Sequence, residues 1–297
     1  MSIINIKNKI FEIIASIFPT QYTDKSKLIN FVWRLLFYSF RPEKPFKFKT
    51  RYYEMIAYPD KYHLSRSVIR RGYWEIEETE LFVKHLNKGM FVIDGGANFG
   101  HYSMVASNIV GPEGLIYAFE PVPNLYKDLI ENIAMCNYEN CKTFNCALGN
   151  KNEKTQFTLD DKNPGGHSLV TDNTLKPGKI IEINMMTMDE LLEKSNLNRP
   201  LGLLKLDTQG GEGIIFEGAI NTIRNDRPII FTEFWPGGIR GTNQDPGYWL
   251  DFFYSLDYKI SIIHKHKINN NFVSKEEIFR YIGPEFSSFA NLRLVPS

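Results

Sequence analysis

Short apolar runs alternate with amphipathic stretches along most of the chain from about Tyr73 onward. Short apolar runs bounded by glycine, proline or acidic residues are typical of buried strands, whereas apolar residues at every third or fourth position indicate helices. Strands are therefore predicted at Met90–Asp94, Leu115–Glu120, Cys141–Ala147, Thr155–Leu159, Ile180–Met186, Leu201–Asp207, Arg227–Phe234, Tyr258–Ile263 and Leu292–Val295. Helices are predicted at Glu77–Leu86, Phe99–Val110, Asn124–Cys136, Met188–Lys194, Glu212–Ile223 and Tyr248–Leu256. This alternation predicts an α/β fold with an open, mostly parallel sheet and helices on both faces.

The N-terminal part of the chain has a different pattern. Ile10–Phe18 and Leu28–Phe40 are apolar segments with Lys and Arg at their edges, and both are shorter than the ~20 residues of a membrane span. They are interpreted as amphipathic helices that pack on the main domain or a second copy of it, or that anchor the protein to an anionic membrane surface. Arg41–Lys49 is interpreted as an extended basic linker. We expect a basic extension over residues 1–60 and one large domain over residues 61–297.

Charge is distributed unevenly between these parts. The first 71 residues carry a net charge of +9, and the remainder carries −8. The large domain is therefore acidic and is not expected to bind nucleic acid. The expected location is the cytoplasm, with possible peripheral contact of residues 1–50 with the inner face of the membrane, and a homodimer is a further possibility.

Cysteine usage agrees with a reducing compartment. The three cysteines, Cys136, Cys141 and Cys146, form no CxxC pair and have no clustered histidines. Reduced, mostly buried thiols are expected, and no metal site is predicted.

A glycine-rich segment carries the most specific signal. The strand at Met90–Asp94 ends in an acid, followed by Gly95, Gly96 and a helix pattern, and the next strand ends in Glu120. This arrangement is typical of a nucleotide-binding βαβ unit. A dinucleotide fingerprint requires G-x-G-x-x-G, whereas this segment has G-x-x-x-G after an acid, which would repel a pyrophosphate. The pattern favours a cationic ligand that carries a ribose, such as S-adenosylmethionine, over NAD(P).

Acidic residues also end other strands of the predicted sheet. Because ligands bind beyond the carboxyl ends of parallel strands, the ends of five strands are expected to share one rim. Those ends are Asp94, Glu120, Ala147, Asp207 and Glu233. Four acids at one rim indicate a binding site.

Several motifs in this order resemble one known family. They are Asp94-Gly-Gly-Ala-Asn-Phe-Gly100, Phe119-Glu-Pro121, Ala147-Leu-Gly149, Met186-Thr-Met-Asp189, Leu204-Lys-Leu-Asp-Thr-Gln-Gly210 and Arg227-Pro-Ile-Ile. Together they are similar to the FkbM family of S-adenosylmethionine-dependent methyltransferases, over about residues 70–295. The resemblance implies a class I methyltransferase fold, Rossmann-like with a seven-stranded sheet, and O-methylation of a hydroxyl on a sugar or related metabolite.

The candidate cofactor residues follow from these motifs. Asp94 can take the ammonium group of the cofactor, Glu120 can accept both ribose hydroxyls, and the helix N-terminus after the glycine loop can hold the carboxylate. Glycine leaves room for close approach of the backbone to the ligand. The cofactor-binding set is Asp94, Gly95, Gly96, Asn98, Gly100, Glu120, Pro121, Ala147 and Asp207.

Methyl transfer to an alcohol also requires a group that removes its proton. The catalytic candidates are His167, Asp207, Lys205 and Glu233, with His167 as the predicted base. For Lys205 the alternative is a bracing ion pair with Glu233 or Asp207. Asp207 and Glu233 could supply metal oxygens, but no acidic motif demands a metal. The predicted function is O-methylation of a sugar, glycan or glycolipid precursor. The alternative is a non-catalytic binding or scaffold module, docked through the basic N-terminus.

Overall fold

The computed structural model describes residues 46–57, 74–135, 137–160, 166–169, 177–264, 271–283 and 288–297, and the single positions 28, 31, 32, 35 and 68. The chain forms two compact units, Met1–Thr79 and Glu80–Ser297. The predicted helix at Ile10–Phe18 lies outside the described residues. Of the second predicted helix, only Leu28, Phe31, Val32 and Leu35 are described, and they are helical. The predicted boundary at residue 60 stays a prediction.

The first unit contains a β-hairpin where an extended linker was expected. Strand β1 (Phe46–Lys49) pairs antiparallel with β2 (Glu54–Ala57). In the turn, the Thr50 hydroxyl donates to the Tyr53 carbonyl at 2.8 Å and accepts from the Tyr53 N–H at 3.0 Å. The linker prediction was therefore wrong over residues 46–49. The alternation of Phe and Lys there is a strand pattern of period two.

The second unit is built on a seven-stranded sheet with the order β11-β12-β10-β9-β3-β4-β5. Its strands are β3 (Phe91–Gly95), β4 (Leu115–Phe119), β5 (Cys141–Phe144), β9 (Leu203–Leu206), β10 (Ile229–Phe234), β11 (Tyr258–Ile263) and β12 (Ala290–Pro296). The strands from β10 to β5 run parallel to their neighbours, and β12 is antiparallel to both β10 and β11. The predicted open, mostly parallel sheet is confirmed.

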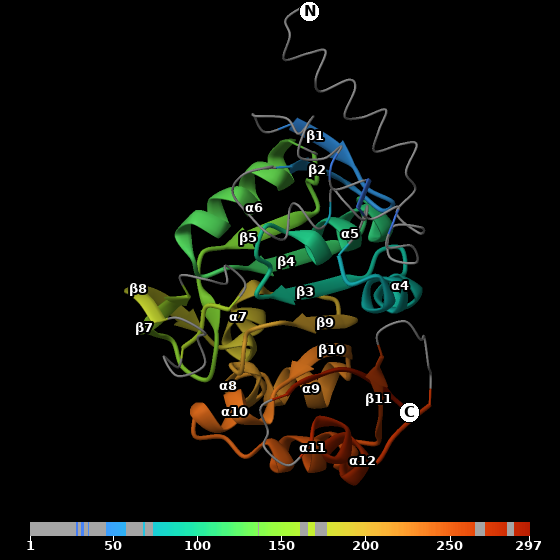
Figure 1. The fold of residues 1–297 in the computed structure, drawn as a ribbon, viewed down its shortest axis with the longest axis vertical. Coiled ribbons are helices and arrows are strands. Elements are labelled where there is room, and N and C mark those ends of the chain that lie inside the picture. Colours follow the sequence, from blue (N-terminus) through green and yellow to red (C-terminus); the bar gives the residue numbers. More distant parts are fainter. Residues whose placement is uncertain are drawn as a thin grey trace, which may run out of the picture. The chain divides into compact units, whose positions relative to one another are not determined.

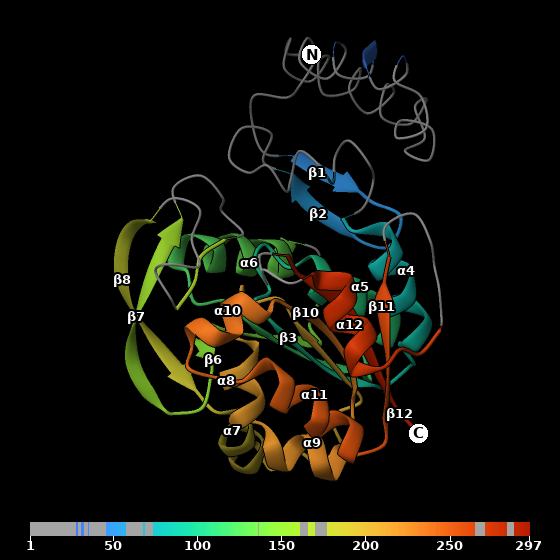
Figure 2. The same cartoon turned by 60° about the horizontal axis from the view of Figure 1, so that its bottom comes forward.

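Helices cover both faces of this sheet (Figures 1 and 2). The helices are α4 (Ile76–His85), α5 (His101–Val110), α6 (Pro123–Met135), α7 (Met188–Ser195), α8 (Glu212–Glu217), α9 (Ile220–Asp226), α10 (Pro236–Gly241), α11 (Pro246–Ser255) and α12 (Lys275–Ile282). On one face, the ring of Phe82 packs edge-on against Tyr102 of α5 and Phe231 of β10. On the other face, side chains of α8, α9 and α11 pack with β3, β9 and β10 into the main apolar core, which includes Phe216 and Trp249.

Two predicted elements are divided in the structure. The helix predicted at Glu212–Ile223 breaks between α8 and α9 at Gly218, where a Cβ atom would lie 1.9 Å from the carbonyl oxygen of Gly149. Glycine thus lets two backbone segments meet. The strand predicted at Cys141–Ala147 divides into β5 and the two-residue strand β6 (Ala147–Leu148), which joins a different sheet. Helices α10 and α12 were missed.

The second sheet contains three strands in the order β6-β8-β7. Strand β7 (Glu153–Asp160) pairs antiparallel with the long strand β8 (Pro177–Met186), and β6 pairs parallel with β8. In Figure 2 the two long strands curve away together at the side of the main sheet. The segment after β7 is pinned back by paired backbone hydrogen bonds between Thr158 and Ser168. This small sheet thus adds a wall beyond the ends of the parallel strands.

Within the described ranges, no helix has both the length and the apolar character needed to cross a bilayer.

Candidate active site

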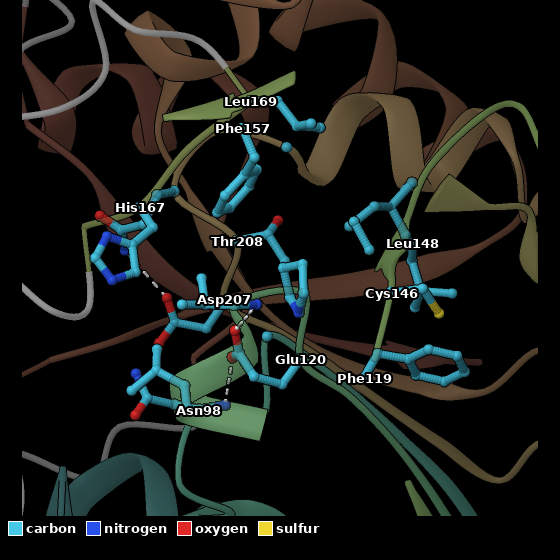
Figure 3. Close-up of a pocket in the computed structure, with 18 residues that line it drawn as sticks. Asn98, Phe119, Glu120, Cys146, Leu148, Phe157, His167, Leu169, Asp207 and Thr208 are labelled. Atoms are coloured by element: carbon cyan, nitrogen blue, oxygen red, sulfur yellow. Dashed lines mark hydrogen bonds between the residues drawn. The ribbon is translucent and has the colours of Figure 1, made fainter. Parts of the chain in front are cut away.

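A cavity that is open to solvent lies at the carboxyl ends of β3, β4 and β9. The lining residues are Gly96, Asn98, Phe119, Glu120, Pro121, Val122, Leu125, Cys146, Ala147, Leu148, Phe157, His167, Leu169, Asp207, Thr208, Gln209, Gly211 and Ile215. Figure 3 shows polar Asn98, Glu120 and Asp207 apart from apolar Phe119, Cys146 and Leu148. One cavity therefore offers both hydrogen-bonding groups and an apolar wall.

The glycine turn after β3 brings two strand ends together. Gly96 has a φ of +81°, and a Cβ atom there would lie 2.1 Å from the carbonyl oxygen of Asp207. A Cβ atom at the neighbouring Gly95 would lie 2.7 Å from the Leu206 side chain. Gly96 is thus required for packing between the β3 and β9 loops. It also lines the cavity, and its predicted role in the close approach of a ligand stays a prediction.

Glu120 is held at the end of β4 by the backbone. Its Oε2 accepts the N–H of Asn98 at 2.9 Å, and its Oε1 accepts the N–H of Val122 at 2.8 Å. Each carboxylate oxygen has two lone-pair sites, so both oxygens retain capacity for a ligand hydroxyl. Burial raises the pKa of Glu120 to about 7, against the opposing effect of the two N–H donors.

Asp94 lies behind the cavity wall, on the face covered by α5. Its Oδ2 accepts the hydroxyl of Ser103 at 2.6 Å, and the side chain is buried. Burial raises the pKa of Asp94 to about 6, although Ser103 and the positive charge of Lys205 both lower it. Asp94 therefore does not line the cavity in this structure, whereas the acids Glu120 and Asp207 do.

Lys205 belongs to the same buried group of charges. Its side chain is 1 % exposed, and its Nζ lies 4.7 Å from the centre of the Tyr102 ring. Burial, together with the charge of Lys205, lowers the pKa of His101 to about 3, so His101 is a neutral imidazole. Neither Lys205 nor His101 lines the cavity. Their positions favour a supporting role for this cluster behind the β3–α5 turn.

The loop after β9 connects the ends of two strands. The side-chain amide of Gln209 donates to Asp207 Oδ1 and to Glu233 Oε2, each at 3.2 Å. The loop itself is braced by buried Glu212, whose Oε1 accepts the N–H and hydroxyl of Thr208, both at 2.8 Å. Glu212 Oε2 accepts the N–H of Gly210 at 3.0 Å. Glu212 thus shapes the loop, while Asp207 faces the cavity.

His167 lines the cavity from the segment after β7, and its ring has a defined orientation. The N–H of Asp160 donates to His167 Nδ1 at 2.7 Å. Nδ1 is therefore an acceptor, and the proton of the neutral ring lies on Nε2. Burial lowers the pKa of His167. In this geometry the remaining nitrogen donates a hydrogen bond, which suits a ligand oxygen better than it suits removal of a proton.

Comparison with known proteins then places the chain. The model of the methyltransferase FkbM domain matches residues 94–260, which is more than half of the chain. The chain belongs to the FkbM methyltransferase family. The match begins at Asp94, and it spans the glycine turn and the loops that carry Glu120 and Asp207. Membership of this methyltransferase family confirms S-adenosylmethionine as the cofactor.

Three known relatives of this FkbM methyltransferase are distant in sequence. Methyltransferase sdnD of Sordaria araneosa is 26 % identical over 200 residues, covering 54 % of this chain and 75 % of that protein. The solved methyltransferase FkbM from Methylobacillus flagellatus KT is 14 % identical with a TM-score of 0.44, covering 71 % of this chain but only 44 % of that one. A putative methyltransferase from Streptococcus mutans, solved in complex with SAH, is 12 % identical with a TM-score of 0.41, covering 75 % and 97 % of the two chains.

The cavity fits this cofactor in its chemistry. Glu120 offers two anchored carboxylate oxygens to the paired hydroxyls of a ribose. The apolar wall of Pro121, Ala147 and Leu148 suits the faces of an adenine ring. Asp207 lies in the same cavity and can face the positive sulfonium.

Not every predicted site residue reaches this cavity. Six of the cofactor candidates line it: Gly96, Asn98, Glu120, Pro121, Ala147 and Asp207. Asp94, Gly95, Gly100, Lys205 and Glu233 lie outside its lining. Gly100 instead forms the N-cap of α5 with a φ of 99°. Lining residues that the sequence did not predict as site residues include Phe157, Leu169, Thr208 and Gln209. Of these, Thr208 and Gln209 had a signal, because they belong to the motif that contains Asp207. Among the described residues, no cluster of three or more His, Cys, Asp or Glu side chains could hold a metal ion.

Proposed function

We propose that this FkbM methyltransferase transfers the methyl group of S-adenosylmethionine to a hydroxyl of a sugar, glycan or glycolipid precursor. The observation that supports this most is the carboxylate of Asp207 on the wall of the cofactor cavity, next to the end of β10. The cofactor supplies a methyl group made electrophilic by a sulfonium. A neutral hydroxyl attacks such a group well only when its proton is removed during transfer.

Asp207 is the residue that we assign to this proton. A carboxylate has about four lone-pair sites. Asp207 therefore retains acceptor capacity after receiving one N–H from Gln209. The hydrogen bond to its Nδ1 leaves His167 as an Nε2–H donor, so we assign it to orienting an oxygen of the acceptor rather than to the base role. The turns at Gly96 and Gly210 keep both strand ends fixed, which favours an aligned approach of the two reactants.

The residues next to Asp207 suit a carbohydrate. Glu233 ends β10 beside it, and Trp235 follows as the half-buried N-cap of α10. The Trp235 ring packs against Gly238, where a Cβ atom would lie 2.4 Å from it. An aromatic surface beside carboxylates offers one group for the apolar face of a sugar ring and others for its hydroxyls. Neither Glu233 nor Trp235 lines the cavity itself, so we infer that a sugar acceptor would reach them only by extending past Asp207.

Calorimetry and an acceptor screen test the proposal. The unaltered protein should bind S-adenosylmethionine, and Glu120→Ala should weaken that binding. In a panel of sugars, nucleotide sugars and glycolipid headgroups, S-adenosylhomocysteine should form and the product should be a methyl ether. Asp207→Asn should slow transfer by about 100-fold or more, the usual loss for a general base. Lack of cofactor binding would refute the proposal. Binding without transfer to any acceptor would favour the scaffold alternative.

A further inference from the structure

Gln209 occupies an unusual position in the loop between β9 and α8. Its φ is +54°, in the left-handed region, and the following Gly210 has a φ of +94°. A left-handed conformation is unfavourable for a non-glycine residue. Such a conformation persists where surrounding contacts impose it, and it is frequent at functional sites.

The side chain of Gln209 joins two acids. Gln209 Nε2 lies 3.2 Å from Asp207 Oδ1 and 3.2 Å from Glu233 Oε2. Carboxylate oxygens accept hydrogen bonds, so the amide nitrogen, which carries two hydrogens, must be the end that faces both. Asp207 and Glu233 lie at the ends of the neighbouring parallel strands β9 and β10. Glu233 is buried, and Asp207 lines the cavity. One neutral amide therefore fixes two carboxylates whose charges repel each other.

The loop is also tied to the wall opposite. The Ser168 hydroxyl donates to the backbone carbonyl of Gln209 at 3.2 Å. Ser168 is itself held by the paired backbone bonds to Thr158. Glu212 holds the other side of the loop through Thr208 and Gly210. The amide of Gln209 thus projects from a backbone that is braced on two sides.

We propose that Gln209 is a positioning residue: its amide holds the Asp207 carboxylate toward the sulfonium methyl and the acceptor oxygen. This inference rests on the proposed function, since it assigns the partner of Asp207 in the same cavity. Glu233, the second acceptor of the amide, serves as the anchor at the end of β10. Without the amide, Asp207 and Glu233 would separate, and the charge facing the methyl group would no longer be fixed.

Two ligands separate positioning from general stability. S-adenosylmethionine and S-adenosylhomocysteine share adenine, ribose and the amino-acid part, and differ by the methyl group and positive charge at sulfur. A carboxylate fixed near that sulfur favours the cation specifically. A damaged fold or cavity weakens the binding of both ligands. The ratio of the two affinities therefore reports the placement of Asp207 and not the integrity of the site.

The test is calorimetry with both ligands on the unaltered protein, Gln209→Met and Gln209→Asn. Met has a similar length without donors, whereas Asn keeps the amide but is one methylene shorter. Both should lose about tenfold in affinity for S-adenosylmethionine, which corresponds to about 1.4 kcal/mol, with S-adenosylhomocysteine changed by less than about twofold. The second variant keeps the test decisive if Met prevents folding.

Gln244→Met is the matched control. Gln244 Nε2 donates to Glu217 Oε2 at 2.9 Å, so it also joins an amide to a carboxylate, but it does not line the cavity. It should leave both affinities unchanged. Equal losses for the two ligands in the Gln209 variants, or an unchanged ratio, would overturn the positioning role. Failure of the unaltered protein to bind S-adenosylmethionine would overturn the proposed function and this inference with it.

Discussion

The proton on Glu120 offers a quantitative test of the site. Glu120 is 4 % exposed, and its two oxygens accept the N–H groups of Asn98 and Val122. Burial and, to a smaller extent, the nearby charge of Asp94 raise its pKa from 4.5 to about 7 against the effect of the two donors. We expect the free energy of unfolding to depend on pH through this residue, and Glu120→Gln to remove that dependence.

The sign and size follow from linkage. The pKa of Glu120 in the folded protein is above its ordinary value, so the folded state holds the proton more tightly than the unfolded state. Its contribution to stability is complete below about pH 4.5 and is lost as the pH rises through about 7. The difference between these two pKa values corresponds to about 3 kcal/mol, most of which falls between pH 5 and 8.

Urea denaturation at pH 5 and pH 8 measures this contribution. The unaltered protein should lose about 2–3 kcal/mol more of its stability over this interval than Glu120→Gln does. Glu182→Gln is the control, because Glu182 is exposed and pairs with Lys154 at the surface. It should follow the unaltered protein. Glu120→Gln also places an amide N–H group near a backbone donor, which changes the stability at every pH. Only the change in the free energy of unfolding between pH 5 and pH 8 is therefore compared. Equal pH dependence in all three proteins would refute the assignment.

Three further variants have expected outcomes, two argued from the structure and one from the charge of the sequence. Gly96→Ala should destabilise the protein by about 3 kcal/mol or more, because φ is +81° and a Cβ would lie 2.1 Å from a backbone oxygen; a loss under about 1 kcal/mol by urea denaturation would contradict this. Ser103→Ala should raise the pKa of Asp94 above about 6, because the hydroxyl stabilises the carboxylate; carboxyl NMR titration measures it, and an unchanged value would exclude the hydrogen bond. Removal of residues 1–50 should reduce sedimentation with anionic vesicles, given their basic charge; equal sedimentation would argue against a membrane contact.

The sequence predicted the sheet and the cofactor correctly. The strands that end in Asp94, Glu120, Asp207 and Glu233 are apolar runs with clear boundaries, and parallel topology then places their ends on one rim. This is a property of local pattern and connectivity, so it is readable without tertiary contacts. The family motifs lie on the same loops, which is why the cofactor could be predicted.

Tertiary contacts decided what the sequence did not reveal. The roles of Gly96 and Gly218 depend on backbone atoms far along the chain, at Asp207 and Gly149. The tautomer of His167 depends on the N–H of Asp160, which no side-chain pattern indicates. Phe157 reaches the cavity from β7, which pairs with β8 in the second sheet. Such long-range pairings override local propensity.

A crystal structure with S-adenosylhomocysteine tests the central claim most directly. The protein should hold the ligand in the cavity at the ends of β3, β4 and β9, with its ribose hydroxyls donating to the two oxygens of Glu120. The sulfur should lie on the side of Asp207. A ligand bound elsewhere, or bound in this cavity with its ribose away from Glu120, would contradict the account.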